Sequence, residues 1–271
     1  MSEEEVVEES PPLPKAVLAH PVVLVDNQSD FRLALDDLLS ASGPLALDAE
    51  RASGFRYSSR AYLVQAHRRG SANYLIDPLG VPDLSDITTE LGDIEWILHA
   101  AHQDLPSLRE IGVEPQILFD TELGARLAGL PRVGLQGVVE DILGLSLAKE
   151  HSAADWSTRP LPEQWLTYAA LDVELLPAVR DEIHHILEIS GKLDLAREEF
   201  AAQLTLSPTG PRAEPWRRLS GLHQIRGPKA LAVARELWQA REEYAREIDT
   251  SPGRLVPDRS LVAALLANPK S

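Results

Sequence analysis

Four carboxylates and one tyrosine are spaced so that they could carry out chemistry together. Asp48 and Glu50 lie two residues apart in the strand-like, otherwise apolar segment 45–50. In a strand, such a pair projects from one face. Two carboxylates on a partly buried face raise each other's pKa unless a cation neutralises them, and hard divalent ions prefer oxygen ligands. Alone, the pair is weak evidence for a site, because a solvent-facing strand end with two acids is the commoner explanation.

Two further groups follow along the chain. Asp104 comes after a strand-like segment and opens a helix, where an aspartate could simply be an N-cap. Tyr168 and Asp172 are four residues apart in a predicted helix, which places them on one face, although core packing and a solvated carboxylate would explain them too. His99 and His102 lie in an apolar segment, so we expect hydrogen-bonded core histidines there and not metal ligands.

The surrounding pattern predicts the elements that must position these residues. The strand-like segments are residues 22–25, 45–50, 61–65, 73–77 and 94–100. The helical segments are residues 31–39, 106–110, 120–129, 135–143 and 162–189, the last interrupted by Pro177. Strands that come first, with helices interleaved later, predict an α/β domain with a mixed sheet, and the three close strands predict a meander.

Composition divides the chain into four parts. Residues 1–20 combine an acidic run with prolines and are expected to form a disordered tail. Residues 21–205 form the α/β domain. Turn-forming residues accumulate over residues 206–215, which are expected to be a linker. Residues 216–271 have helical character only.

The composition also limits the class of protein. A chain of 271 residues with 44% hydrophobic residues can bury one sizeable core and a smaller one. It has no cysteine, so a metal would need carboxylate, histidine or backbone ligands. No run approaches the roughly 20 apolar residues of a membrane span, and the acidic N-terminus is unlike a secretory signal. We therefore expect a cytoplasmic protein with no membrane partner.

The net charge of −16 has the wrong sign for a protein that mainly coats nucleic acid. The charge is unevenly distributed, however. Between residues 211 and 235, six basic residues face only Glu214, which gives that stretch a local charge of 6 − 1 = +5.

The three groups together resemble the three exonuclease motifs of the DEDDy family, specifically ribonuclease D. The order is Asp48-x-Glu50, then Asp104, then Tyr168-x-x-x-Asp172. The flanking segments 76–78, 155–160 and 161–168 agree, so the resemblance covers roughly residues 20–205. Gln103 stands where relatives often carry an acid, at a position that is not a metal ligand in the family. The resemblance implies an RNase H-like mixed sheet flanked by helices, as in DnaQ-like exonucleases.

The resemblance also implies a mechanism with two divalent ions, Mg²⁺ or Mn²⁺. Asp48 would bridge both ions. Glu50 and Asp172 would hold the ion that activates the attacking water, and Asp104 would support the second ion through water. Tyr168 would orient the attacking water.

Residues 216–238 resemble the opening of the HRDC domain, a small helical module shared by RecQ-type helicases and ribonuclease D. The pair Gly227-Pro228 is a suitable helix start, whose free N–H groups could meet a phosphate. The alternative is a generic helical bundle with a basic face. As the family is known, the module would be incomplete at Ser271. The residues expected to contact nucleic acid are Arg217, Arg218, Arg226 and Lys229.

The function implied is that of a 3′-5′ exoribonuclease that releases nucleoside 5′-monophosphates. Its substrates would be RNAs with single-stranded 3′ ends, such as tRNA precursors. Two alternatives stay open, because the motifs report the chemistry and not the sugar. One is a DNA 3′-5′ exonuclease of the same superfamily. The other is an inactive nucleic-acid-binding scaffold, which the presence of all five site residues argues against.

Overall fold

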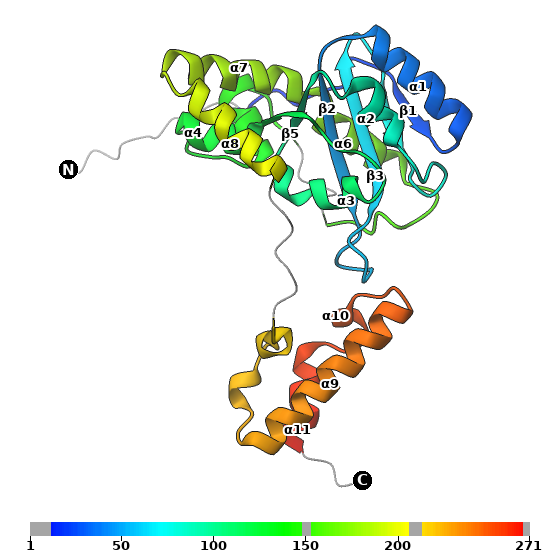
Figure 1. The fold of residues 1–271 in the computed structure, drawn as a ribbon, viewed down its shortest axis with the longest axis vertical. Helices are drawn as coiled ribbons and strands as arrows, with labels where there is room; N and C mark the ends of the chain where they lie inside the picture. Colours follow the sequence, from blue (N-terminus) through cyan, green and yellow to red (C-terminus); the bar gives the residue numbers. More distant parts are fainter. Residues whose placement is uncertain (1–11, 148–152, 206–212, 268–271) are drawn as a thin grey trace, which may run out of the picture.

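The computed structural model describes residues 12–147, 153–205 and 213–267. The chain forms an α/β domain, described from residue 12 to residue 205, and a helical module, residues 213–267 (Figure 1). None of the described helices is both long and apolar enough to cross a membrane.

The elements follow one another as strands first and helices later. The strands are β1 (Val22–Val25), β2 (Ser42–Arg51), β3 (Ala61–Arg69), β4 (Asn73–Ile76), β5 (Glu95–Leu98) and β6 (Ile117–Asp120). The helices of the α/β domain are α1 (Gln28–Ser40), α2 (Ser85–Leu91), α3 (Leu105–Arg109), α4 (Thr121–Ala128), α5 (Leu135–Val138), α6 (Glu163–Glu174), α7 (Leu176–Ile189) and α8 (Leu193–Thr205). The helical module contains α9 (Pro228–Glu247), α10 (Pro252–Leu255) and α11 (Asp258–Ala267).

The six strands form one mixed sheet in the order β1-β4-β3-β2-β5-β6. Strands β2, β3 and β4 pair antiparallel, which confirms the predicted meander. Strands β1, β5 and β6 join in parallel pairings. Strand β6 was not predicted, because four residues directly before a helix carry too little periodicity to be distinguished from its first turn.

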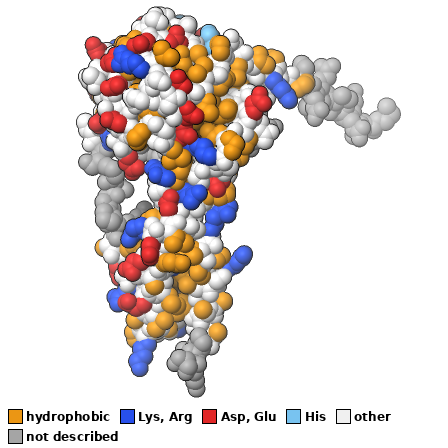
Figure 2. Space-filling model, turned by 90° about the vertical axis from the view of Figure 1, so that its right-hand side faces the viewer, with side chains coloured by type: hydrophobic (Ala, Val, Ile, Leu, Met, Phe, Trp, Pro, Cys, Tyr) orange, Lys and Arg blue, Asp and Glu red, His pale blue; other side chains and the backbone are white. Residues whose placement is uncertain are grey.

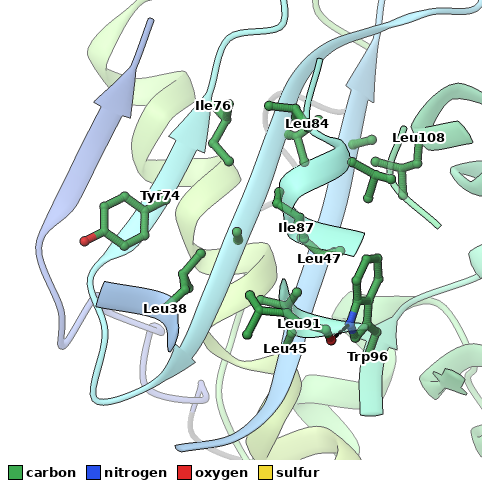
Figure 3. Close-up of a cluster of buried hydrophobic side chains, with 14 of the residues drawn as sticks. Leu38, Leu45, Leu47, Tyr74, Ile76, Leu84, Ile87, Leu91, Trp96 and Leu108 are labelled. Atoms are coloured by element: carbon green, nitrogen blue, oxygen red, sulfur yellow. Dashed lines mark hydrogen bonds between the residues drawn. The ribbon is translucent and has the colours of Figure 1, made fainter. Parts of the chain in front are cut away.

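One hydrophobic core lies between the sheet and helices α1 and α2 (Figure 3). Leu45 and Leu47 of β2 are fully buried there beside Ile87 and Leu91 of α2. The indole N–H of Trp96 donates a 2.8 Å hydrogen bond to the carbonyl of Leu91, so this buried donor is satisfied. Burying each such leucine contributes about 1.5–3 kcal/mol, which fixes β2 at the centre of the sheet.

The long helical stretch after residue 162 is divided in two, as Pro177 predicted. Helix α6 ends at Glu174, and Pro177 lies in the first turn of α7, where its missing N–H costs no helical hydrogen bond. Helix α6 packs against β2, β3 and β4, on the sheet face opposite α1 and α2.

Part of the expected N-terminal tail, within residues 12–20, contacts the α/β domain. Lys15 forms a parallel β-bridge with Ser146, and the backbone N–H of Ala19 donates to a carboxylate oxygen of Glu174 at 2.7 Å. Proline-rich composition indicated disorder, but these contacts satisfy some of the backbone groups of the segment. Residues 1–11 of the expected tail lie outside the described residues.

The helical module has a small core of its own, built from α9, α11 and the turns before α9. Arg241 of α9 is buried in it. Its guanidinium donates to the carbonyl of Val256 at 2.9 Å and to the carboxylate of Asp258 at 2.7 Å. These bonds tie the end of α10 and the start of α11 to α9.

The module contacts the α/β domain at the β2–β3 loop, residues 52–60. Asp249, between α9 and α10, accepts a 2.9 Å hydrogen bond from the backbone N–H of Ser58 and a 3.3 Å bond from the hydroxyl of Tyr62. The backbone N–H of Ser251 donates to the carbonyl of Phe55 at 2.9 Å. Figure 1 shows this loop extending toward α10.

We predict that Asp249→Gly loosens this contact. Asp249 has a φ of 45°, which glycine adopts without strain, so the substitution removes the acceptors and leaves the backbone conformation accessible. Hydrogen bonds to a charged group are worth about 1.5–3 kcal/mol, so hydrogen exchange of residues 52–60 should quicken by about tenfold or more. Ser251→Ala is the matched control, because Ser251 makes its contact through the backbone. Unchanged exchange in the glycine variant would contradict this role.

Candidate active site

All five residues singled out for chemistry line one pocket of about 580 Å³. They come from three separate segments: the end of β2, the turn after β5, and helix α6. The predicted site residues brought together are Asp48, Glu50, Asp104, Tyr168 and Asp172.

Strand β2 directs Asp48 and Glu50 to the face covered by α6. Side chains alternate along a strand, and Leu47 and Ala49 belong to the core on the opposite face. Ala46, which shares the parity of the two carboxylates, packs with residues of α6 and α7. Side chains that alternate along β2 fill the core on one face. The same alternation places the two acids together on the other face, at a cost in free energy.

Helix α6 supplies Tyr168 and Asp172 from one face, as their spacing predicted. Ala169 and Ala170, between them, are fully buried against the sheet. The small alanine side chains let the helix approach the strands closely, which brings both functional groups to β2.

The segment before α6 is anchored to the sheet by a partly buried ion pair. The guanidinium of Arg159 binds both carboxylate oxygens of Asp77, at 2.6 and 2.7 Å, and also donates to the backbone carbonyls of Tyr62 and Trp156. Bidentate pairs of this kind fix orientation as well as distance. The contact joins two of the segments that carried the family resemblance, residues 76–78 and 155–160.

Asp104 is positioned by a residue that the sequence did not single out. Ala100 has a φ of 59°, a left-handed conformation that an alanine rarely adopts. The buried carboxylate of Asp120 accepts hydrogen bonds from the backbone N–H groups of Ala100 and Ala101, at 3.0 and 2.9 Å. Asp120 also caps α4, and that N-cap position was the only signal that could have drawn attention to it.

The alternative interpretation of Asp104 as an N-cap is wrong. Its side chain makes no capping hydrogen bond to α3. It is only 5% exposed, shares a hydrogen bond with Asp48, and lies 3.3 Å from the guanidinium of Arg51. The side chain therefore points into the pocket and not at the helix that it opens.

Three of the carboxylates converge closely. Asp48, Glu50 and Asp172 each offer an oxygen within 4.8 Å of the others. Burial raises the pKa of Asp48, and a backbone N–H and Arg51 oppose that rise. Burial raises the pKa of Glu50 well above its usual range, and the charges of Asp48 and Asp172 add to the effect. The pKa of Asp172 is raised in the same way by burial and by Asp48.

Asp104 and Tyr168 complete this electrostatic environment. Burial and the charge of Asp48 raise the pKa of Asp104 well above its usual range. The hydroxyl of Tyr168 donates a hydrogen bond to Asp172, and burial beside the carboxylates raises the pKa of Tyr168. Tyr168 therefore stays a neutral hydroxyl near neutral pH, able to donate and accept hydrogen bonds.

The two histidines differ from each other. His99 lines the pocket and is half-buried, with Nδ1 at 2.9 Å from the hydroxyl oxygen of Thr121. This contact confirms the expectation of a hydrogen-bonded histidine for His99. Burial lowers the pKa of its imidazole. The same expectation is wrong for His102, which is exposed. Neither histidine belongs to the group of converging metal-type ligands among the described residues.

The basic residues expected to contact nucleic acid lie in the helical module, away from the pocket lining. All are exposed, and Arg217 is paired with Glu214 and stacked on Trp216. These four basic residues are Arg217, Arg218, Arg226 and Lys229.

The donor set suits a hard divalent cation. Only carboxylate oxygens converge at the cluster, which are the ligands that Mg²⁺ and Mn²⁺ prefer. A cation there would oppose the burial that raises all four carboxyl pKa values, and the repulsion from Asp48 that adds to the rise for Glu50, Asp104 and Asp172.

The chain is similar to families and proteins that are already known. Residues 22–188 match the family described as 3′-5′ exonuclease, and residues 230–271 match the HRDC domain. Ribonuclease D of Escherichia coli is 32% identical over 237 residues, which are 86% of this chain and 63% of that protein. The exosome complex exonuclease RRP6 of Saccharomyces cerevisiae is 29% identical, over 90% of this chain and 36% of its own length.

Solved structures agree as well. A protein from Bifidobacterium adolescentis is 46% identical with a TM-score of 0.89, over 95% of this chain and 65% of that one. The crystal structure of Escherichia coli RNase D has a TM-score of 0.69 at 29% identity, over 92% of this chain and 67% of that one. The chain thus spans about two thirds or less of these relatives. Its carboxylate pocket, its fold and these matches show that it belongs to the 3′-5′ exonuclease family of the ribonuclease D type, with an HRDC domain.

Proposed function

We propose that this chain is a metal-dependent 3′-5′ exoribonuclease that hydrolyses phosphodiester bonds and releases nucleoside 5′-monophosphates. The observation that carries the proposal is the convergence of four carboxylates and a tyrosine hydroxyl in one pocket, from the three segments that define the family motifs. A scaffold without catalysis has no need for four mutually repelling acids in one pocket, two of them buried and two half-buried, because each raises the free energy of the folded protein near neutral pH.

Asp48, Glu50, Asp104 and Asp172 are proposed to hold two divalent ions, Mg²⁺ or Mn²⁺. Asp48 has the central place, since its charge raises the pKa of each of the other three carboxyls. It is therefore the natural bridging ligand. Such ions, when bound, stabilise the charge that develops on the attacking and leaving oxygens of an in-line displacement at phosphorus.

Tyr168 is proposed to orient the attacking water. Its hydroxyl already binds Asp172, and a neutral hydroxyl can hold a water molecule without competing for the metal. Asp120 and Arg159 are proposed to position the site without contacting the metal ions. Asp120 fixes the backbone turn before Asp104, and Arg159 fixes the segment that leads into α6.

RNA with a single-stranded 3′ end is the proposed substrate, including structured RNAs such as tRNA precursors. This rests on the relatives, since the structure of the Escherichia coli protein is described as that of an exoribonuclease involved in structured RNA processing. The exposed residues Arg217, Arg218, Arg226 and Lys229 are proposed to contact phosphates of the structured part. Matched RNA and DNA oligonucleotides would separate this proposal from a DNA exonuclease, and a cytoplasmic location stays a prediction.

We predict that Mg²⁺ stabilises the folded protein more at about pH 8 than at about pH 6. The raised carboxyl pKa values mean that the folded state holds protons that the unfolded state has released. The stability that these retained protons contribute is complete below the pKa of the carboxyls in the unfolded chain, and it is lost as pH rises through their pKa in the folded protein. A bound cation therefore stabilises the folded protein most at high pH, where the carboxylates are charged. At 100 times its dissociation constant, the ion would add about 2.7 kcal/mol. Thermal unfolding with and without Mg²⁺ measures the difference.

Asp48→Asn should remove the Mg²⁺ effect without lowering the melting temperature of the metal-free protein, because it relieves repulsion and leaves packing intact. Asp194→Asn is the control, since its carboxylate is 94% exposed and lies on α8. An equal Mg²⁺ effect in both variants would rule out the assigned ligand role.

We predict that Tyr168→Phe lowers kcat by about 10²-fold or more while the affinity for metal changes little, because the hydroxyl positions water and is not a ligand. Activity assays and metal titration of the same preparation measure the two effects. Tyr244→Phe, at an exposed tyrosine of α9, is the control. A parallel loss of metal affinity in the Tyr168 variant would show that the hydroxyl acts through the ligands.

We predict digestion from the 3′ end. A 5′-labelled RNA strand should shorten stepwise, with nucleoside 5′-monophosphates as products. A 3′-phosphate should block it, because the proposed site must hold the unmodified terminal nucleotide beside the metal ions. A circular RNA should also resist. Efficient cutting of the circle would identify an endonuclease instead.

A further inference from the structure

Two arginines of the β2–β3 loop lack the ion pairs that neutralise the rest of the domain. Within its described residues, every arginine outside residues 52–60 either pairs with a carboxylate or, as Arg68 does, donates to backbone carbonyls. Arg56 and Arg60 form no ion pair among the described residues. Arg246 and Arg254, on the part of the helical module that faces the loop, form none either. Four arginines without an ion pair thus meet at one contact of an acidic protein, although the charge of Arg60 also acts on Asp249 there. Arg218, Arg226 and Arg259 of the helical module form no ion pair among the described residues either, but they are not part of this contact.

Aromatic rings hold these guanidinium groups in place. Arg254 lies 3.9 Å above the ring centroid of Phe55, and Arg246 lies 5.1 Å from the ring of Tyr57. Arg60 stacks on Tyr62 in the same way, at 4.8 Å. Stacking on one face fixes the plane of a guanidinium and leaves N–H groups at its edge for a phosphate.

The arginines are also accessible. Arg60, Arg246 and Arg254 are all exposed, although Arg254 donates one hydrogen bond to the carbonyl of Gly54 and Arg246 donates one to the hydroxyl of Tyr57. Figure 2 shows Lys and Arg side chains gathered at the narrow part of the molecule, where the two domains meet.

This basic seam, defined by Arg60, Arg246 and Arg254, is connected to the active site. A second pocket of about 260 Å³ is lined by Gly54 and Phe55, which Arg254 contacts. The same pocket is lined by Ala49, Glu50 and Arg51, which also line the carboxylate pocket. The two pockets are therefore neighbours along the end of β2, and Arg254 lies against the far lining of the second one.

We propose that the basic seam binds the phosphate backbone of the single-stranded RNA segment directly upstream of the 3′-terminal nucleotide. The proposal rests on the proposed function for the identity of the strand. Arginines from both domains meet there, so the strand would cross the domain contact. Its recognition is independent of sequence, because stacked guanidinium groups read phosphates and not base edges. In a chain with a net charge of −16, such a local group of positive charges attracts the RNA strand and thereby orients it.

The test is binding without hydrolysis. A fluorescent single-stranded RNA is titrated with the full chain in chelator, so no turnover occurs, and anisotropy is followed over a range of salt concentrations. Arg246→Gln/Arg254→Gln is compared with Arg197→Gln/Arg259→Gln, which removes the same charge from two exposed arginines outside the seam. Each phosphate contact contributes about 0.7 to the slope of log affinity against log salt on single strands.

The seam variant should bind several-fold more weakly, with a slope smaller by about 1.4, and the control should match the unsubstituted chain. Arg246→Lys/Arg254→Lys should recover most of the slope, because it keeps the charges. Equal slopes in the seam variant and the control would overturn the proposal. A lysine variant as weak as the glutamine variant would also overturn it, because the arginines would then act through domain contact alone. Since no hydrolysis is measured, failure here is separate from failure of the proposed nuclease activity.

Discussion

Electrostatic repulsion among four carboxylates in one pocket is the constraint on which the rest of the structure depends. Asp48, Glu50 and Asp172 meet within 4.8 Å, and Asp104 shares a hydrogen bond with Asp48. Of the described basic side chains, only Arg51 forms an ion pair with one of the four. Near neutral pH, this arrangement costs free energy that packing elsewhere must offset.

The backbone around the pocket is correspondingly well anchored. Strand β2 lies inside the sheet, between β3 and β5, with leucines buried on its far face. The Arg159–Asp77 pair ties the segment before α6 to β4, and Asp120 holds the left-handed turn at Ala100. None of these anchors touches the converging carboxylate oxygens, so they can hold the acids together without neutralising them. The site is thereby ready for a cation.

The parts of the site with local periodicity were predictable from the sequence. The i, i+2 spacing of Asp48 and Glu50 and the i, i+4 spacing of Tyr168 and Asp172 determine a shared face once the element type is known. Asp104 could be predicted as a site residue only from its order relative to the other motifs, because its position alone equally suited an N-cap. The relative placement of these residues is set by others close to them in the sequence, and hydrophobic periodicity predicts such local placement well.

Contacts between distant segments were not predictable in the same way. Asp120 had the signature of a helix cap, and its bonds to the turn at Ala100 arise only because β5 and β6 are parallel neighbours. The stacked arginines depend on a contact between residues about 190 apart. The local charge of +5 noted for residues 211–235 lies in and just before the helical module, but periodicity could not reveal the arginines that meet at the β2–β3 loop.

Proton release on metal binding tests the central claim most directly. Calorimetric titration of the metal-free chain with Mn²⁺, in two buffers of different ionisation enthalpy, gives the number of protons released per ion bound. If the carboxylates retain protons because of burial and mutual repulsion, binding near neutral pH must release protons, and both binding and release must be strongly reduced in Asp48→Asn. Binding without proton release, or unchanged binding in that variant, would contradict the account.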